Sequence, residues 1–184
     1  MLEVQTAEKD LVLRLSQSGR SRDLAFSELM DLYQERVYWH IRRLVHYHED
    51  ADDVLQNTFV KVFRNIGKFN GDSTLFTWIY RIATNESITH LKKKKRLAAD
   101  SIDEETPIFL KADDYFDGDR AALLLKSAIA NLPEKQMLVF NMRYYEELSY
   151  QEISEVCDTS VGSLKASYHH AVKKIEEFLK NNGV

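Results

Sequence analysis

Aromatic, short polar and basic side chains are concentrated in the stretch FNGDSTLFTWIYRIATNESITHLKKKKR, from Phe69 to Arg96. Nucleic-acid bases stack on aromatic faces, and phosphates attract lysine and arginine. The candidate stacking residues are Phe69, Phe76, Trp78 and Tyr80. The candidate donors and acceptors for a base edge are Asn70, Asp72, Ser73 and Thr74, and the phosphate charges are Lys92 to Arg96. This pattern predicts a surface that holds an unpaired nucleic-acid strand.

The same stretch also fits a helix that packs against a protein core. Leu75, Trp78, Ile79, Ile82 and Ala83 follow the i, i+3, i+4, i+7 spacing of a core-facing stripe. Aromatic residues at this spacing are more often buried than exposed. The stretch alone therefore leaves both interpretations open, and the rest of the chain favours strand binding.

A second candidate site lies in LSYQEISEVCDTSVGSLKASYHHAVKKIEEFL, from Leu148 to Leu179. Ser149 followed by Glu152 is a capping box that opens a short helix. Asp158 stands at a sharp turn, where aspartate tolerates a left-handed backbone. Thr159 or Ser160 then caps a longer helix. The pattern predicts a helix-turn-helix, whose second helix enters a DNA major groove.

The longer of these two helices has an apolar and a basic side. The inward residues are predicted to be Val161, Leu164, Tyr168, Val172 and Ile175. The outward residues are predicted to be Ser163, Lys165, Ala166, Ser167, His169, His170, Lys173 and Lys174. A helical hairpin without DNA is the alternative, but the short capped helix, the tight turn and the basic outer side together favour DNA binding.

A third candidate surface is the polar side of a helix expected from Asp50 to Ile66. Its buried side would carry Ala51, Val54, Leu55, Phe59, Val62, Phe63 and Ile66. Its water-facing side would carry Asp52, Asp53, Gln56 and Asn57. Most such faces are simply solvated, so a protein-docking role is one of two interpretations at this point.

Composition places the chain among folded proteins. It has 184 residues, 44% of them hydrophobic, which suffices for one medium or two small domains. No apolar run is long enough to cross a bilayer, and MLEVQTAEKD lacks the pattern of a secretory signal, so we expect a cytoplasmic protein without membrane insertion. Cys157 is the single cysteine and is expected to be a small packing residue.

The periodicity predicts an all-α protein of two small helical domains joined by a flexible acidic linker. The domains are expected at residues 1–96 and 121–184, and the linker at 97–120. The expected helices run from about Ala7 to Gln17, Asp23 to Tyr47, Asp50 to Ile66, Ser73 or Thr74 to Arg96, and Pro133 to Tyr145, before the helix-turn-helix.

The predicted linker has an unusual charge. Between Leu97 and Arg120 there are eight acidic residues against Lys111 and Arg120, a net of −6. Subtracting this −6 from the formal net charge of −4 leaves about +2 for the rest of the chain. The acidic total therefore does not exclude nucleic-acid binding.

Two other function classes fit parts of the sequence. A metal-dependent phosphohydrolase would use His46, His48, Asp50 and Asp53, but His46 and His48 point apart on a helix, so no metal site or cofactor is expected. A dimeric helix-turn-helix regulator would need a ligand pocket and a palindromic site. It explains neither the aromatic stretch nor the linker.

Taken in order, these segments resemble the extracytoplasmic-function (ECF) sigma factors of bacterial RNA polymerase. AFSELMDLYQERVY, DADDVLQNTFVKVFRNI and GDSTLFTWIYRIATNESITHLKKKKR resemble sigma domain 2. LPEKQMLVFNMRYYEELSYQEISEVCDTSVGSLKASYHHAVKKIEEFL resembles sigma domain 4. The resemblance implies a monomeric, non-enzymatic transcription initiation factor whose partners are RNA polymerase core, promoter DNA and, in some cases, an anti-sigma factor.

The resemblance also implies residue roles. Asp52, Asp53, Gln56 and Asn57 would dock on the clamp coiled coil of the largest polymerase subunit, and domain 4 on the flap. Promoter −10 contacts would come from Phe69, Asn70, Gly71, Asp72, Ser73, Thr74, Trp78, Tyr80, Arg81 and Asn85. Promoter −35 contacts would come from Ser163, Lys165, Ser167, His169, His170, Lys173 and Lys174. Asn57 stands where many members have glutamate, and Ser167 and His170 stand where arginine is common.

Overall fold

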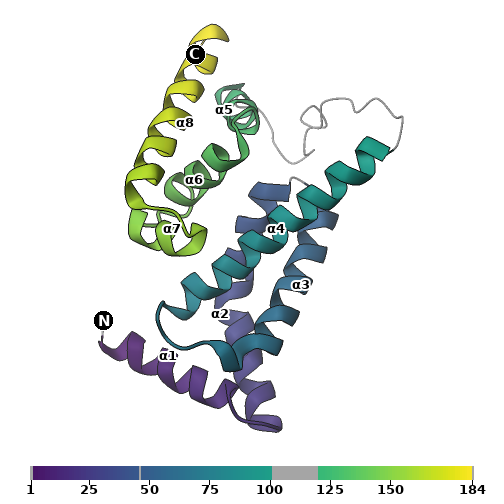
Figure 1. Ribbon diagram of the computed structural model, residues 1–184, viewed down its shortest axis with the longest axis vertical. Coiled ribbons are helices and arrows are strands. Elements are labelled where there is room, and N and C mark those ends of the chain that lie inside the picture. Colours follow the sequence, from purple (N-terminus) through teal and green to yellow (C-terminus); the bar gives the residue numbers. More distant parts are fainter. Residues whose placement is uncertain (1, 46, 101–119, 184) are drawn as a thin grey trace. The chain divides into compact units, whose positions relative to one another are not determined.

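The computed structural model describes residues 2–45, 47–100 and 120–183, which are helical apart from short turns and loops and contain no strand (Figure 1). Contacts divide these residues into two compact units. The first comprises α1, α2, α3, η1 and α4 up to Lys93, and the second is built on α5 to α8. The all-α prediction is confirmed.

The helices of the first unit begin and end within a few residues of the expected positions, except at one end each of α1 and α4. They are α1 (Leu2–Leu15), α2 (Arg20–Val45), α3 (His48–Asn65), the 3-10 turn η1 (Ile66–Lys68) and α4 (Leu75–Asp100). Helix α4 continues through Asp100, so residues 97–100, which were expected in the linker, are helical. The rest of the predicted linker, 101–119, lies outside the described residues.

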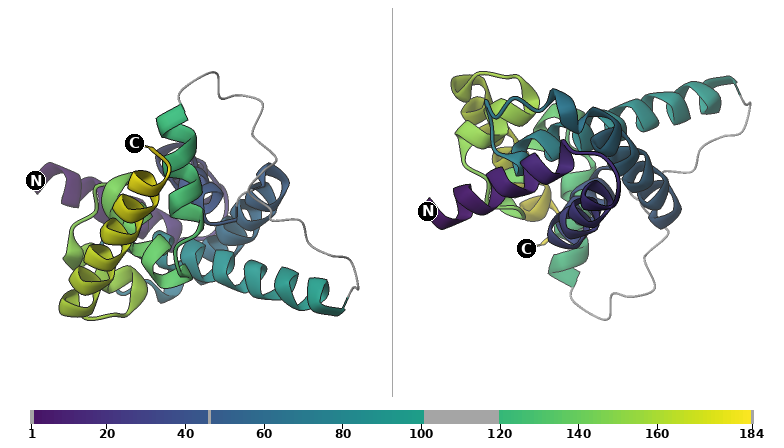
Figure 2. Two further views of the ribbon diagram at one scale, coloured as in Figure 1. Left: turned by 90° about the horizontal axis from the view of Figure 1, so that it is seen from above. Right: turned by 90° about the horizontal axis from the view of Figure 1, so that it is seen from below.

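Helices α2 and α3 form the centre of the first unit, with α1 lying against the start of α2 (Figure 2). The apolar stripe of α2 places Leu29, Val37 and Ile41 in the core. Where the start of α2 meets the end of α3, the Phe26 ring packs edge-on against the Phe63 ring, with 4.9 Å between centroids. The Arg22 guanidinium lies 4.0 Å from the centroid of the Phe63 ring.

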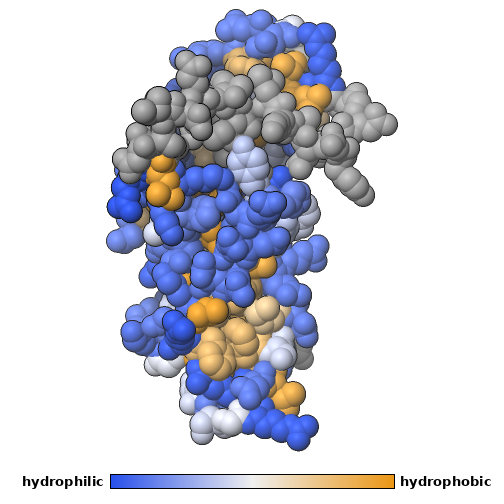
Figure 3. All heavy atoms as spheres, turned by 90° about the vertical axis from the view of Figure 1, so that its right-hand side faces the viewer, coloured by the Kyte–Doolittle hydropathy of each residue, from blue (hydrophilic) through white to orange (hydrophobic). Residues whose placement is uncertain are grey.

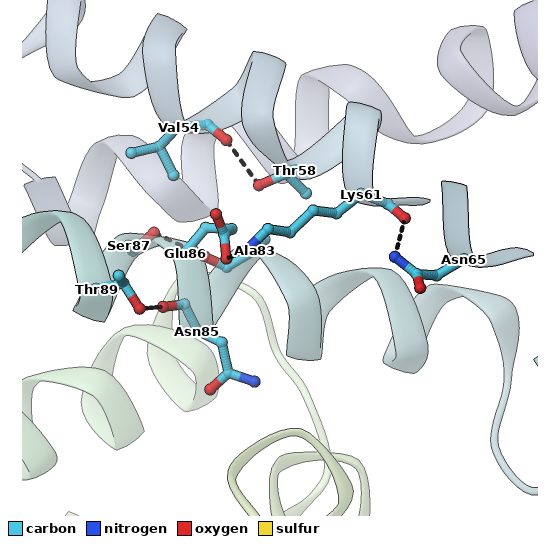
Figure 4. Close-up of polar contacts among 9 residues, drawn as sticks. All are labelled: Val54, Thr58, Lys61, Asn65, Ala83, Asn85, Glu86, Ser87 and Thr89. Carbon is cyan, nitrogen blue, oxygen red and sulfur yellow. Dashed lines mark hydrogen bonds and ion pairs between the residues drawn. The ribbon is translucent and has the colours of Figure 1, made fainter. Parts of the chain in front are cut away.

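Helices α3 and α4 run in opposite directions and are joined by polar pairs (Figure 4). The Lys61 ammonium pairs with the Glu86 carboxylate, and His90 Nε2 lies 3.0 Å from Asp50 Oδ1. Two buried hydroxyls bond within their own helices: Thr58 donates to Val54 O and Ser87 donates to Ala83 O. Each hydroxyl therefore enters the core with its hydrogen bond satisfied.

Helix α4 also carries a buried polar contact to α2. His40 is fully buried, and its Nε2 lies 2.9 Å from Thr84 Oγ1. Its ring packs on that of Tyr80 at 4.7 Å between centroids. This hydrogen bond fixes how α2 and α4 are aligned along each other. Apolar contacts alone would not specify one alignment, because they have no direction.

The second unit consists of α5 (Arg120–Ala130), α6 (Glu134–Tyr144), α7 (Tyr150–Cys157) and α8 (Val161–Asn181). Helix α8 packs against both α5 and α6. All six residues of α6 from Met137 to Met142 are buried, so this short helix forms the centre of the unit. The sequence predicts a helix that begins at Pro133; in the structure Pro133 is the N-cap and the helix begins one position later, at Glu134.

The face of the molecule drawn in Figure 3 is largely hydrophilic. Apolar side chains, in orange, gather in the lower part of the view, which belongs to the first unit. Large apolar residues exposed in this unit include Leu13, Leu24 and Val60. Apolar atoms make up a large share of the surface of any folded domain, so this gathering by itself does not mark a binding site.

Candidate nucleic-acid and protein interfaces

The loop between η1 and α4 is fixed at its first residue. Phe69 is half-buried, and its ring packs on Trp78 with 5.6 Å between centroids. Its backbone N–H donates to Ile66 O at 3.0 Å, which closes the 3-10 turn. Gly71 follows with a φ of +80°, a left-handed conformation that glycine adopts without strain.

The polar residues of this loop are held by one another and by the start of α4. Asn70 Nδ2 donates to the Asp72 carboxylate, while Asn70 Oδ1 accepts from the Asp72 N–H at 3.4 Å. Thr74, one of two candidate caps, accepts from the Thr77 N–H at 3.1 Å. Asn70, Gly71, Asp72 and Thr74 are exposed, and Ser73 is half-buried. The loop thus presents short polar groups to solvent in a defined backbone conformation.

Three of the candidate residues on α4 share one face. Arg81 and Asn85 are exposed, Trp78 is half-buried, and their spacing of three and four residues aligns them along the helix. Phe76 is half-buried and does not share this face. Its ring centroid lies 4.1 Å from that of Tyr80, and the Arg36 guanidinium lies 4.4 Å from the Phe76 centroid.

Tyr80 requires a correction. It is 1% exposed, and its hydroxyl donates to Arg36 O at 3.2 Å. The rings of His40 and Phe76 pack against it, with 4.7 and 4.1 Å between centroids. Because Tyr80 is buried, it is a core residue and is removed from the candidate strand surface.

The acidic side of α3 is exposed as the apolar period predicts. Asp52, Asp53, Gln56 and Asn57 are all exposed, while Ala51, Val54 and Thr58 on the other side are buried. The sequence pattern missed Thr58 because its side chain is polar. Its hydrogen bond to the Val54 carbonyl explains how it enters the core (Figure 4).

The helix-turn-helix has the local structure that its sequence predicts. Ser149 and Glu152 form the complete capping box of α7. Asp158 adopts the left-handed conformation, with φ +50° and ψ +48°. Ser160, one of the two predicted caps, accepts from the Ser163 N–H and opens α8. Ser149 and Glu152 therefore fix the start of α7, and Asp158 and Ser160 fix the turn that leads into α8.

The outer side of α8 carries the predicted basic and polar residues. Ser163, Lys165, His169, His170, Lys173 and Lys174 are exposed, and Ser167 is half-buried. The Lys165 ammonium lies 5.8 Å from the centroid of the Tyr150 ring on α7. Inward, Leu164 and Ile175 are buried as expected, and Tyr168 stacks on Phe140. Ala171, which the pattern placed on neither side, is fully buried.

The Ser149→Ala variant is expected to lower the free energy of unfolding of the second unit by about 1 kcal/mol, because it removes the hydrogen bond that the Ser149 hydroxyl accepts from the Glu152 N–H and the one that it donates to the Glu152 carboxylate. Ser167→Ala, on α8 away from any cap, should change it little. Urea unfolding followed by circular dichroism measures the difference. Equal midpoints for the two variants would contradict this role of the cap.

The described ranges contain no group of three or more His, Cys, Asp or Glu residues that could hold a metal ion. His46, one of the histidines weighed for such a site, lies outside them. Cys157 is half-buried. Within these same ranges, no helix is both long and apolar enough to cross a membrane.

Comparison with known protein families identifies the class of protein to which these surfaces belong. Residues 29–97 match the family model of sigma-70 region 2, and residues 122–175 match that of sigma-70 region 4. The two matches cover the loop, α3, α4 and the helix-turn-helix. The fold and these surfaces define a sigma-70-type transcription initiation factor.

Relatives that match over nearly the full chain narrow the class. The RNA polymerase sigma-H factor of Pseudomonas aeruginosa is 34% identical, with 96% of this chain and 95% of the relative covered. The ECF RNA polymerase sigma-E factor of Haemophilus influenzae is 31% identical, with 94% and 95% covered. The chain belongs to the ECF family of RNA polymerase sigma factors.

Solved structures agree on the fold. The sigma factor RpoE in complex with the anti-sigma factor NepR, from Bartonella quintana, matches with a TM-score of 0.68 at 23% identity, covering 84% of this chain and 96% of that one. CnrH in complex with the cytosolic domain of CnrY matches with a TM-score of 0.70 at 18% identity, covering 96% and 99%.

The family fixes the function at the level of the whole chain. The protein is an alternative sigma factor, which binds RNA polymerase core and directs promoter recognition and transcription initiation. It is not an enzyme. This function accounts for the two matched regions together, which neither the phosphohydrolase nor the dimeric regulator does.

Proposed function

We propose that the sigma-factor function is divided among three surfaces of this chain. The observation that supports the division is that each candidate surface is the exposed side of an element whose other side is buried: α3, the loop with α4, and α8. We assign domain 2 to residues 1–96 and domain 4 to residues 121–184, with the acidic segment between them as a tether.

The first surface is the loop Phe69 to Thr74 together with Trp78, Arg81 and Asn85, and it holds the non-template strand of the −10 element. Flipping a base out of the duplex costs a few kcal/mol, and stacking returns about 1 to 3 kcal/mol per base. Asn70, Asp72 and Ser73 would bond the edge of a flipped base. The surface therefore favours opened over closed DNA.

The second surface is the outer side of α8, which enters the major groove of the −35 element. Ser163, Lys165, Ser167, His169 and His170 are nearest the base edges, and Lys173 and Lys174 contact phosphates. Ser167 and His170 lack the arginine fork that grips guanine. We therefore expect the base preference at the positions they contact to differ from that of relatives with arginine there.

The third surface is the acidic side of α3, which docks on the clamp coiled coil of the largest polymerase subunit. Asp52 and Asp53 supply the charge, with Gln56 and Asn57 beside them. Asparagine at position 57 removes a charge that glutamate would provide. The remaining two carboxylates should consequently carry more of the interaction.

Asp53→Lys is expected to weaken binding to polymerase core about tenfold or more, because it places a like charge against a basic partner surface. Fluorescence titration of the labelled full-length chain with core polymerase measures the affinity. Asp31→Lys is the matched control, since it makes the same charge change on an exposed position of α2. If reversal of both Asp52 and Asp53 left the affinity at the level of this control, the third surface would be misassigned.

Further partners follow from the same proposal. Domain 4 would contact the polymerase flap, and the free protein would be a monomer in the cytoplasm, where polymerase and chromosome are found. Of the two structural neighbours, the sigma factor RpoE is bound to the anti-sigma factor NepR, and CnrH is bound to the cytosolic domain of CnrY. An anti-sigma factor that covers one of the three surfaces would inhibit this chain as well.

The test of the whole proposal is in vitro transcription with sigma-free core polymerase on genomic DNA. Added protein should yield discrete transcripts whose start sites share −10 and −35 elements. Transcripts that are unchanged in the presence of alanine substitutions on all three surfaces would overturn the proposed division.

A further inference from the structure

One carboxylate of α1 reaches the loop from a distant part of the sequence. Glu8 Oε1 accepts a hydrogen bond from the backbone N–H of Leu75, the first residue of α4. The two residues are 67 positions apart in the chain. Leu75 itself is fully buried, so the backbone at this point is fixed on both sides.

The N–H of Leu75 needs a partner that α4 cannot provide. The first four N–H groups of a helix have no acceptor within the helix. Thr74 accepts from the Thr77 N–H through its side chain and from the Trp78 N–H through its carbonyl, at 3.1 Å in each case. Glu8 supplies an acceptor for the first N–H and a negative charge at the positive end of the helix.

Glu8 is held in place by the packing of its own helix. Leu11 and Leu15, on the inner side of α1, are 2% and 1% exposed. Arg14 bonds both Asp10 and Glu28, at 2.8 Å each, which joins α1 to α2. Nearby, burial and then the charge of Glu8 raise the pKa of Tyr33, against the opposing effect of Arg36.

We propose that Glu8 is a positioning residue for promoter opening: by holding the start of α4, it fixes the loop Phe69 to Thr74 in the conformation that receives the −10 strand. The loop has Phe69 packed on Trp78 at one end and Glu8 bonded to Leu75 just beyond the other. This inference rests on the proposed role of the loop in strand binding.

The expected sign separates positioning from simple electrostatics. A carboxylate beside a strand-binding surface repels phosphates, so its removal alone would strengthen binding. A positioning carboxylate has the opposite effect, because the loop loses its fixed end. Glutamine keeps an oxygen that can accept from Leu75 N–H, so it should retain the function without the charge.

The experiment compares full-length chain variants, assembled with core polymerase, on a single-stranded −10 oligonucleotide and on a −35 duplex. Glu8→Ala should weaken oligonucleotide binding about tenfold or more, as expected for loss of one hydrogen bond to a charged group, and leave duplex binding unchanged. Glu8→Gln, which keeps a neutral hydrogen bond, should recover most of this loss. Glu35→Ala is the matched control, because it makes the same change at an exposed position of α2.

Each outcome supports or overturns a specific statement. Weaker binding by Glu8→Ala with recovery in Glu8→Gln supports positioning. Unchanged or tighter binding by Glu8→Ala, while Asn70→Ala binds weakly, overturns the role of Glu8 but leaves the loop assignment standing. If Asn70→Ala also binds as wild type, the proposed function of the loop is wrong. Circular dichroism of each variant must show unchanged helix content, and a loss of helix in Glu8→Ala alone would make its role one of folding.

Discussion

The Trp78→Ala variant should bind a closed promoter with wild-type affinity. The fraction of promoter that it opens should fall about tenfold or more, because stacking on one base is worth about 1 to 3 kcal/mol. Permanganate footprinting of unpaired thymines measures opening, and gel-shift titration on the same promoter measures binding. A template with a pre-melted −10 bubble should partly rescue the variant.

Trp39→Ala is the matched control for this experiment. Trp39 is an exposed tryptophan of α2 in the same unit, and its ring packs on Tyr38 outside the loop. It should open the promoter as wild type does. An equal opening defect in both variants would mean that Trp78 acts through the general stability of the first unit, and the strand-binding role would be lost.

Lys165→Ala and Lys173→Ala are expected to fail at the earlier step, with duplex binding weakened about fivefold or more. For Lys173, the phosphate contact, the slope of log affinity against log salt should become shallower by about 0.9. Lys180→Ala, an exposed lysine in the last turn of α8, is the control and should change neither quantity.

A pre-melted bubble should not fully restore promoter binding by either lysine variant. The bubble removes the free-energy cost of opening the strands, but it does not replace the lost contact between lysine and the duplex. The two classes of variant are therefore distinguished by one template. If Trp78→Ala and Lys165→Ala gave the same footprint, the same gel-shift affinity and the same response to the bubble, the division of labour would be wrong even though the family assignment stands.

Local signals in the sequence predicted most of the helix-turn-helix. The capping box at Ser149, the left-handed Asp158 and the cap at Ser160 depend on residues at most four positions away, and all three are present. The acidic side of α3 followed in the same way from the spacing of its apolar residues. Structure fixed by neighbours in the chain can be predicted from the chain.

Contacts between distant residues were missed. Tyr80 belongs to an aromatic stretch that suited DNA, and only its packing between His40 and Phe76 shows that it is buried. Ala171 is a different case: it lies seven residues after Leu164 and four before Ile175, so the helical period does place it on the inward side, and its small side chain was left out of the stripe although it is fully buried. The bond between Glu8 and Leu75 spans 67 positions, and no local rule connects them.

The continuation of α4 through Asp100 determines how its basic run can be used. Lys92 to Arg96 are five consecutive exposed residues of a helix, and each step along a helix turns by about 100°. Their charges therefore point in all directions around the axis, and a single strand passing along one side meets about two of them. Such a strand would release fewer counterions than five charges suggest. The contribution of this run to the slope of log affinity against log salt would be about −1.4, whereas an unstructured basic tail with the same five charges would give roughly −3.5. The helix therefore limits the phosphate contacts of this run to about two for a strand that lies along any one side.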